Sequence, residues 1–192
     1  MSSKSTLADS LLVFFLFYSS YLFYTAYVNA VNRNTVTIYT ELERKVEEGK
    51  AFTSSKRFSL SSGSSIRILF NNKANVNVKI VAVEVNTEAN VLIDIYDNVT
   101  VNVEGNAWAI RNLNLGSNYM TNVRIEDSGD YADGELIHQT IGYGGTKNFA
   151  VGSLSEVGEK VIIPSNNNFM IVITNDTTQE IKISVRFIFY EA

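Results

Sequence analysis

A run of 23 residues without a charged side chain, from Ser10 to Asn32, constrains this chain more than any other feature. As a helix it would span roughly 35 Å at about 1.5 Å per residue, which is enough to cross a bilayer. Its first half is apolar on every side, and its second half mixes tyrosines with Ser, Thr and Asn. The run therefore predicts a helix buried in a membrane or in the core of an assembly. The residues expected to make its contacts are Leu12, Phe15, Leu16, Tyr18, Leu22 and Phe23.

Three fates are compatible with such a segment. It can anchor the protein in lipid, form the shared helical core of a filament, or serve as a secretory signal that is cleaved. The signal interpretation is the weakest, because the apolar region is long and Tyr27-Val28-Asn29-Ala30 is a poor cleavage motif. Lys4 before the run and Arg33 after it nearly balance, so the positive-inside rule gives no orientation.

The helical pattern continues into a charged segment, residues 33–49. Ile38, Leu42 and Val46 follow one another at a spacing of four, which places them on one helix face. Gly49 is a natural C-terminal stop for this helix. We expect a helical stalk in which Ile38, Leu42 and Val46 pack. It would either lift the following domain away from the surface or fold back onto that domain.

After Gly49 the hydrophobic period changes from 3.6 to 2, which marks the main boundary in the chain. Short alternating runs follow, separated by turns rich in Gly, Asn, Asp and Ser. They lie at residues 66–70, 76–82, 91–95, 99–103, 108–110, 123–125, 161–163, 170–174 and 181–189. This pattern predicts a mainly β fold: an antiparallel β-sandwich, jelly-roll-like, preceded by one long N-terminal hydrophobic α-helix. The expected organisation is a short polar N-terminus at 1–9, the transmembrane or assembly helix at 10–32, the stalk at 33–49 and the sandwich at 50–192.

The composition argues against most kinds of chemistry. Lys and Arg number 16 against 20 Asp and Glu, for a net charge of −4, and this lacks the basic excess that nucleic acid binding needs. With no cysteine and a single histidine, His138, the chain cannot build a disulfide, a thiolate metal site or an iron–sulfur cluster. We therefore expect a protein that is not an enzyme, with no catalytic residue, no metal and no cofactor.

Two groups of acidic residues offer the remaining alternatives. The run 126–135 has oxygens that could bind calcium, but its Asp spacing of three does not match an EF-hand loop. A solvated turn is the better interpretation of that run. Asp94, Asp97 and Glu104 are the strand-adjacent carboxylates from which a glycoside hydrolase would have to draw its catalytic pair.

Several residues are expected at the outer surface of the β domain. Asn98 and Asn175 each open an Asn-X-Thr triplet beside a predicted turn, so both are potential glycosylation sites. The loops at 126–135 and 142–147 are expected to make surface contacts. Within them Tyr131 and Tyr143 would be the exposed contact groups, because tyrosine gives a large contact area at low entropic cost.

A series of short segments has a layout typical of one group of viral proteins. They are Gly49-Lys50-Ala51-Phe52, Asp94-Ile95-Tyr96-Asp97-Asn98-Val99-Thr100-Val101, Arg111-Asn112-Leu113-Asn114-Leu115, Leu136-Ile137-His138 followed by Gly144-Gly145, Ile163-Pro164, the strand from Asn168-Phe169 to Asn175, and Phe187-Ile188-Phe189-Tyr190-Glu191. In this layout the chain resembles small β-sandwich structural proteins carried on virions of bacterial and archaeal viruses. The resemblance implies a non-enzymatic shell, spike or decoration role. The N-terminal hydrophobic helix departs from it and suggests a membrane-containing particle or a helical assembly.

The expected function is that of a structural surface protein on a virion or cell-surface membrane, with the β domain exposed outside. Its expected partners are copies of itself, a lipid bilayer or neighbouring helices, and a host surface glycan or protein. One alternative is a pilin-like filament subunit, with a helical core and a coat of β domains. A further alternative is a membrane-tethered glycan-binding module.

Overall fold

The computed structural model describes residues 41–144, 152–153 and 161–192. The chain divides into two compact units, Met1–Arg44 and Lys45–Ala192. The predicted helix at 10–32, with its six contact residues, and Ile38 of the stalk lie outside the described residues. Within the described ranges, no helix has both the length and the apolar character needed to span a membrane.

The one helix in the described part is short and covers residues 41–47, within the predicted stalk at 33–49. It ends at Gly49, as predicted, because this glycine adopts a φ of 71°. The Gly49 amide donates to the Val46 carbonyl at 2.9 Å and the Lys50 amide donates to the Lys45 carbonyl at 2.8 Å. This pair of bonds is a Schellman motif, which satisfies the last carbonyls of the helix and turns the chain into the first strand.

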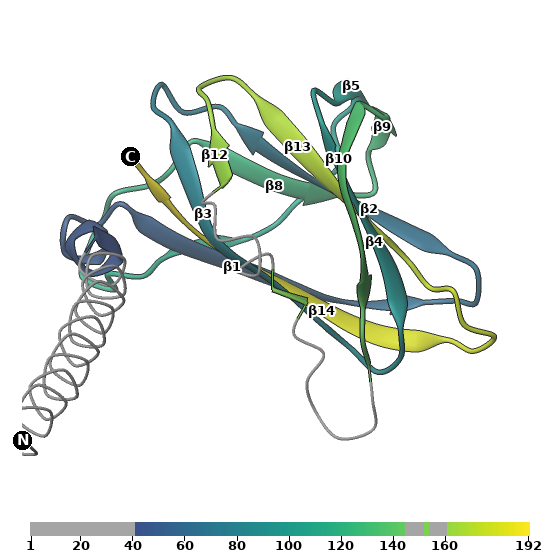
Figure 1. The fold of residues 1–192 in the computed structure, drawn as a ribbon. Coiled ribbons are helices and arrows are strands. Elements are labelled where there is room, and N and C mark those ends of the chain that lie inside the picture. Colours follow the sequence, from purple (N-terminus) through teal and green to yellow (C-terminus); the bar gives the residue numbers. More distant parts are fainter. Residues whose placement is uncertain (1–40, 145–151, 154–160) are drawn as a thin grey trace, which may run out of the picture. The chain divides into compact units, whose positions relative to one another are not determined.

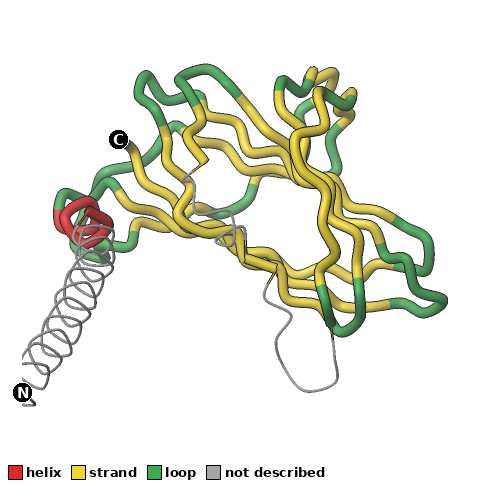
Figure 2. Tube along the Cα trace, viewed as in Figure 1, coloured by secondary structure: helices red, strands yellow, loops and turns green. Residues whose placement is uncertain are grey.

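The second unit is a sandwich of two antiparallel sheets, which we call sheet A and sheet B (Figures 1 and 2). Sheet A contains β1 (Ala51–Leu60), β3 (Val78–Thr87), β7 (Ile110–Asn112), β11 (Gly152–Ser153), β12 (Val161–Ile163) and β14 (Ile181–Glu191). Sheet B contains β2 (Ser65–Asn72), β4 (Val91–Asp97), β6 (Asn106–Ala107), β8 (Val123–Asp127), β10 (Glu135–Gly142) and β13 (Asn168–Thr174). A separate two-stranded sheet pairs β5 (Thr100–Val103) with β9 (Asp130–Ala132).

The strands pair in a nested order. β1 pairs with β14, β2 with β13, β3 with β12 and β4 with β10, and successive pairs alternate between sheets A and B. The paired strands thus follow one another as a double-stranded ribbon that is folded into the two layers of the sandwich. The short strands β6, β7 and β8 follow β4 and extend the sheets at the β1 and β2 side.

The main core lies between the two sheets and is almost entirely aliphatic and aromatic. Alternate residues of each central strand point inward, as the period of two predicts. Phe70 lies at the centre of an aromatic group, with ring centroids 5.3 Å from Phe169, 5.7 Å from Phe187 and 5.2 Å from Phe189. These separations fall in the range where aromatic pairs attract each other beyond simple burial.

A second, smaller core covers the outer face of sheet B. Val99, just before β5, and Tyr131 of β9 pack on Leu69, Met170 and Val172. Strand β13 is therefore apolar on both faces, which explains its unbroken hydrophobic sequence. The expectation that Tyr131 is an exposed contact residue is wrong: its side chain is only 2% exposed. Its side chain instead packs between the β5–β9 pair and sheet B.

The buried side chains of Asn72 and Asn175 hold turns of the sandwich. Asn175 donates to the carbonyls of Leu60, Ser61 and Gln179, and its Oδ1 accepts from the amide and hydroxyl of Thr177. The residue is fully buried, so the expectation of a glycosylation site at Asn175 is wrong for the folded chain. In contrast, Asn98 is exposed at a turn with a φ of 54°.

Candidate binding surface

The neighbouring edges of the two sheets, β10 and β12, carry exposed apolar side chains. Among the described strands β10 pairs only with β4, and its register shifts between Leu136 and His138, where a bulge adds one residue. The bulge removes Ile137 from the inward-outward alternation, so Leu136 and Ile137 are 49% and 54% exposed. On β12, Ile162 is 51% exposed, and Pro164 ends the strand. We call Leu136, Ile137, Ile141, Val161 and Ile162 the apolar edge patch.

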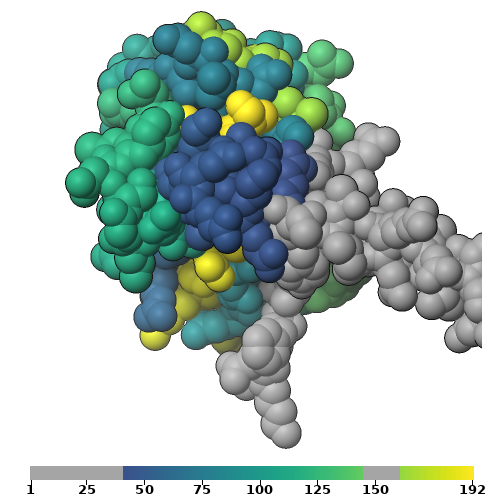
Figure 3. All heavy atoms as spheres, turned by 90° about the vertical axis from the view of Figure 1, so that its left-hand side faces the viewer, coloured from purple at the N-terminus to yellow at the C-terminus, as the bar shows by residue number. Residues whose placement is uncertain are grey.

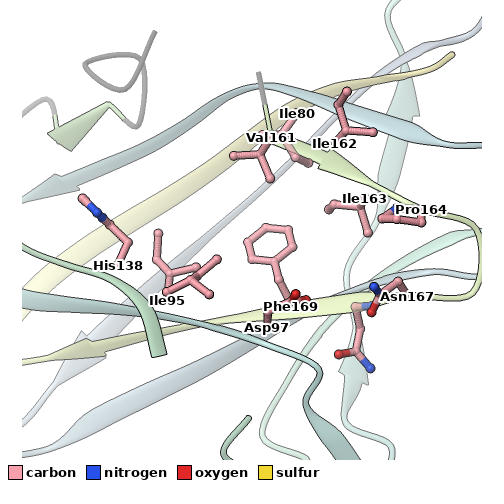
Figure 4. A pocket seen from close by; sticks show the side chains of 12 residues that line it. Ile80, Ile95, Asp97, His138, Val161, Ile162, Ile163, Pro164, Asn167 and Phe169 are labelled. Atoms are coloured by element: carbon pink, nitrogen blue, oxygen red, sulfur yellow. The ribbon is translucent and has the colours of Figure 1, made fainter. Parts of the chain in front are cut away.

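A cavity of about 430 Å³ opens between these edges, and we call it the edge pocket. The Phe169 ring lies at its centre, between Ile95 and Ile163, with His138 towards one end and Asn167 towards the other (Figure 4). Ile137 and Ile162 of the apolar edge patch line it too. The pocket therefore joins the exposed patch to the interior of the sandwich, and its volume is in the range of ligand-sized sites.

The polar side chains around the edge pocket are partly engaged in holding turns. Asp97 accepts a hydrogen bond from the Asn98 amide at 2.9 Å. Asn168 of β13 holds the chain just before β5. Its Oδ1 accepts from the Val99 amide at 2.9 Å, and its Nδ2 donates to the Val99 carbonyl at 3.0 Å. His138 is half-buried in the wall. What remains for a ligand is mainly apolar surface, which favours an apolar group over a charged one.

The acidic run 126–135 is solvated only in part: Ser128, Asp130, Asp133 and Glu135 are exposed, but its first two carboxylates are buried. Glu126 and Asp127 close strand β8 and are 0% and 3% exposed. Asp127 accepts from the Trp108 indole and from the Lys56 ammonium, both at 2.5 Å, and from Ser128 at 2.8 Å. Burial raises the pKa of Asp127, but the hydrogen bonds from Lys56, Ser128 and Trp108 outweigh it and leave the pKa below its ordinary value.

Arg124 links the rest of this acidic cluster. Its Nε donates to Glu126, and its Nη1 lies 2.9 Å from Glu104, which also pairs with Lys73 at 2.7 Å. The hydrogen bond from Lys73 and the charge of Arg124 lower the pKa of Glu104. Across residues 41–144 and 161–192, no three His, Asp or Glu side chains gather where they could share a metal ion. The carboxylates of this cluster are committed to cations of the protein itself.

The three carboxylates considered for glycoside hydrolysis lie in separate environments. Asp94 and Asp97 are an odd number of residues apart on β4, so they face opposite sides of sheet B. Asp94 accepts from Gln139 at 2.7 Å, whereas Asp97 lines the edge pocket. Glu104 is tied to Lys73 and Arg124. The structure therefore does not bring them together across one groove.

Three other residues singled out from the sequence lie in the described ranges: Tyr143, predicted as a surface contact, and Leu42 and Val46, predicted to pack in the stalk. Tyr143 follows β10 directly and is 68% exposed, as expected for a contact residue. Residues 145–147 of its loop lie outside the described ranges. Leu42 and Val46 of the stalk are half-buried.

Sequence reasoning missed the edge pocket because its lining comes from five strands far apart in the chain. In the sequence, His138 and Asp97 were considered only as separate candidates for catalysis. They line the same pocket because β4 pairs with β10, and that pairing is not visible in the sequence. The available signal was the segment Leu136-Ile137, where two adjacent apolar residues break the alternation of a strand.

A scan against protein-family models gives no match, and a search of the curated proteins finds none either.

Proposed function

We propose that this protein is a non-enzymatic structural subunit that assembles with copies of itself at a virion or cell surface. In this proposal the N-terminal helix at 10–32 anchors or bundles the subunits, the stalk spaces them, and the jelly-roll domain packs outside. The likeness in layout to virion β-sandwich proteins supports the virion as its setting. The pilin-like filament is the main alternative architecture for the same helix and domain.

The apolar edge patch is the observation that carries this proposal. Natural sheet edges are usually protected by short strands, lysines or prolines, because an open edge invites pairing with another chain. β10 is eight residues long, with the sequence ELIHQTIG, and has neither lysine nor proline. At the opposite edges, β6 and β7 have only two and three residues. Among the described residues, only this side of the sandwich presents a long apolar edge strand without these protections, and such an edge is typical of a surface used for protein contacts.

The experiment is to measure the assembly of the full-length chain extracted in a mild detergent. Analytical ultracentrifugation should show a defined oligomer, and electron microscopy should show whether the native material forms virions, fibres or detergent-solubilised particles. Ile137→Lys should shift the population to smaller species. The matched control is Val103→Lys, at an exposed apolar residue on β5, which should leave the oligomer unchanged. A natural chain that remains a monomer at all concentrations would overturn the proposal.

A further inference from the structure

The loop from residue 113 to residue 122 exposes apolar side chains more fully than any other part of the described chain. Leu115 is 94% exposed, Met120 is 85% exposed and Tyr119 is 47% exposed. No residue of this loop is charged. We call it the Leu115 loop. Single exposed apolar residues are ordinary on protein surfaces, but a group of three on one uncharged loop indicates a contact site.

The Leu115 loop is held in one conformation by a dense set of hydrogen bonds. Asn114 accepts from the Gly116 amide at 3.0 Å, and Ser117 accepts from the Tyr119 amide at 3.1 Å. The Tyr119 hydroxyl donates to Glu191 at 2.5 Å, and this bond raises the pKa of the tyrosine. Glu191 also accepts from Thr121 at 2.7 Å. A loop ordered in advance binds with a smaller loss of entropy.

The loop also packs tightly on the start of the β domain. A Cβ placed on Gly49 would lie 2.3 Å from the Ser117 hydroxyl oxygen, so the loop and the helix end are in direct contact. Asn112 donates to the Gly49 carbonyl at 2.6 Å. In Figure 3 the teal-green residues of this part of the chain stand at the surface beside the blue residues that lead into β1. Leu115 and Met120 are thus presented from a rigid base.

The Leu115 loop and the edge pocket lie on opposite sides of the sandwich. The loop connects β7 to β8, at one edge of the strand order in both sheets. The pocket lies between β10 and β12, at the other edge of both sheets. A contact between the two must therefore be made between different molecules. Because the two surfaces differ, the contact is heterologous, and repeating it produces a ring or an open array.

We propose that the Leu115 loop of one copy inserts Leu115 and Met120 into the edge pocket of the next copy. This inference rests on the proposed function, because it specifies how the subunits meet. The occupant is a second copy because this chain itself supplies an uncharged, ordered, apolar projection and an apolar cavity at the opposite edge. The bulge of β10 and the exposed Ile162 side chain form the rim that closes around the inserted loop.

Cysteine cross-linking tests this contact directly, because the natural chain contains no cysteine. Full-length Leu115→Cys and Ile162→Cys proteins are mixed in mild detergent and oxidised. A disulfide requires Cα atoms within about 7 Å, so it reports a specific contact. The mixture should give a cross-linked dimer, and each variant alone should not. The control mixture pairs Val103→Cys with Ile162→Cys. It should give at most about one tenth as much disulfide-linked dimer.

A complementation experiment separates this contact from a symmetric one. Leu115→Asp and Ile162→Asp should each prevent assembly through this contact, whereas a mixture of the two should restore the contact within pairs of molecules and not beyond them. In such a mixture only one intact loop and one intact pocket can meet. Val103→Asp should assemble like the natural chain.

Several results would overturn the inference. If the natural chain assembles but the Leu115→Cys and Ile162→Cys mixture cross-links no faster than the control, the loop does not enter the pocket, although self-assembly stands. If Ile162→Cys alone cross-links faster than the mixture, the contact is pocket to pocket. A natural chain that stays monomeric removes both this inference and the proposed function.

Discussion

Buried polar side chains decide the local geometry of this protein at the scale of single residues. Asn72 repeats the arrangement described for Asn175: its amide donates to the carbonyls of Val76, Ile163 and Pro164, and its Oδ1 accepts from the Ala74 amide. Each asparagine satisfies backbone groups that a turn leaves without strand partners. The sequence shows only that asparagine is frequent near turns, so it does not distinguish these two from exposed ones.

Asn175→Asp should destabilise the fold strongly. The change keeps the shape but replaces the donating amide with an oxygen that faces the carbonyls of Leu60, Ser61 and Gln179. We expect the free energy of unfolding to fall by about 3 kcal/mol or more, as measured by chemical denaturation. Asn75→Asp, at an exposed position, is the matched control and should have little effect. Equal effects at the two positions would contradict the role given to Asn175.

Asp127 should make stability depend on acid pH. Its pKa is lower in the folded protein, so the stabilisation is complete above the unfolded value of about 3.9 and is lost as pH falls through the folded pKa. At neutral pH, Asp127→Asn should lower the free energy of unfolding by roughly 2 to 3 kcal/mol. The difference from the natural chain should shrink below about pH 4.

Denaturation curves from pH 7 down to pH 3 would measure this effect. Glu104→Gln, which removes an exposed carboxylate from the neighbouring ion pairs, should change the curves much less. A gap between Asp127→Asn and the natural chain that stays constant over the whole range would show that another group causes the acid sensitivity.

At the scale of elements, the strands with clean alternation were predictable and those with inward polar residues were not. The predicted runs at 66–70, 91–95, 170–174 and 181–189 all lie within strands. β1 was missed because Ser54 and Lys56 occupy inward positions among its apolar residues. Ser54 donates to the Ala109 carbonyl at 2.9 Å, and Lys56 reaches Asp127 at 2.5 Å. Those partners come from distant parts of the chain, so no local pattern reveals them.

The exposure of Tyr131 was mispredicted for the same reason. Its neighbours in sequence are Asp130, Ala132 and Asp133, which read as a polar turn. Burial follows from the pairing of β9 with the distant strand β5, which places the two strands over the outer face of sheet B, where the Tyr131 side chain packs with Leu69, Met170 and Val172. Burial and the charge of Glu126 raise the pKa of Tyr131 to about 12.

Gly49→Ala should separate a steric effect from a backbone effect at the helix end. Gly49 and Gly63 both have positive φ, at 71° and 67°. An added Cβ meets Ser117 at Gly49, whereas nothing lies within 4 Å at Gly63. Gly63→Ala should cost about 1 to 2 kcal/mol of unfolding free energy, from the backbone alone. Gly49→Ala should cost clearly more. Thermal denaturation of the two variants compares their losses of stability. Equal losses would mean that the Leu115 loop shifts to make room for the added Cβ without an energetic cost.

At the scale of the whole molecule, the sequence predicts a division between a charge-free segment and a β domain with little chemistry of its own. The β-sandwich domain is the part that the structure shows. The role of residues 10–32 stays a prediction, because this segment lies outside the described residues.

A lysine in the charge-free segment tests that prediction. Leu16→Lys places a charge near its middle, which costs roughly 2.5 to 3.5 kcal/mol at the centre of a membrane helix. In a flotation assay with phospholipid vesicles, the natural chain should rise with the vesicles and Leu16→Lys should do so less. Ser2→Lys, outside the segment, should behave like the natural chain. A natural chain that stays in the aqueous fraction as a monomer without detergent would refute the anchoring role.

The nested pairing of β1 with β14 also determines where this domain accepts added sequence. Ala51 lies opposite Tyr190, and the Glu191 amide donates to the Lys50 carbonyl at 3.0 Å, so the entry and exit of the domain are neighbours. A tag joined after Ala192 would emerge beside the helix end and the Leu115 loop, where it would obstruct contacts. The turn at Ser61–Ser64 lies at the far end of β1, and Gly63 has open space around it. Peptides for labelling or display would be kept away from the entry and exit in that turn, provided that the insertion leaves the Ser61 carbonyl in place for Asn175.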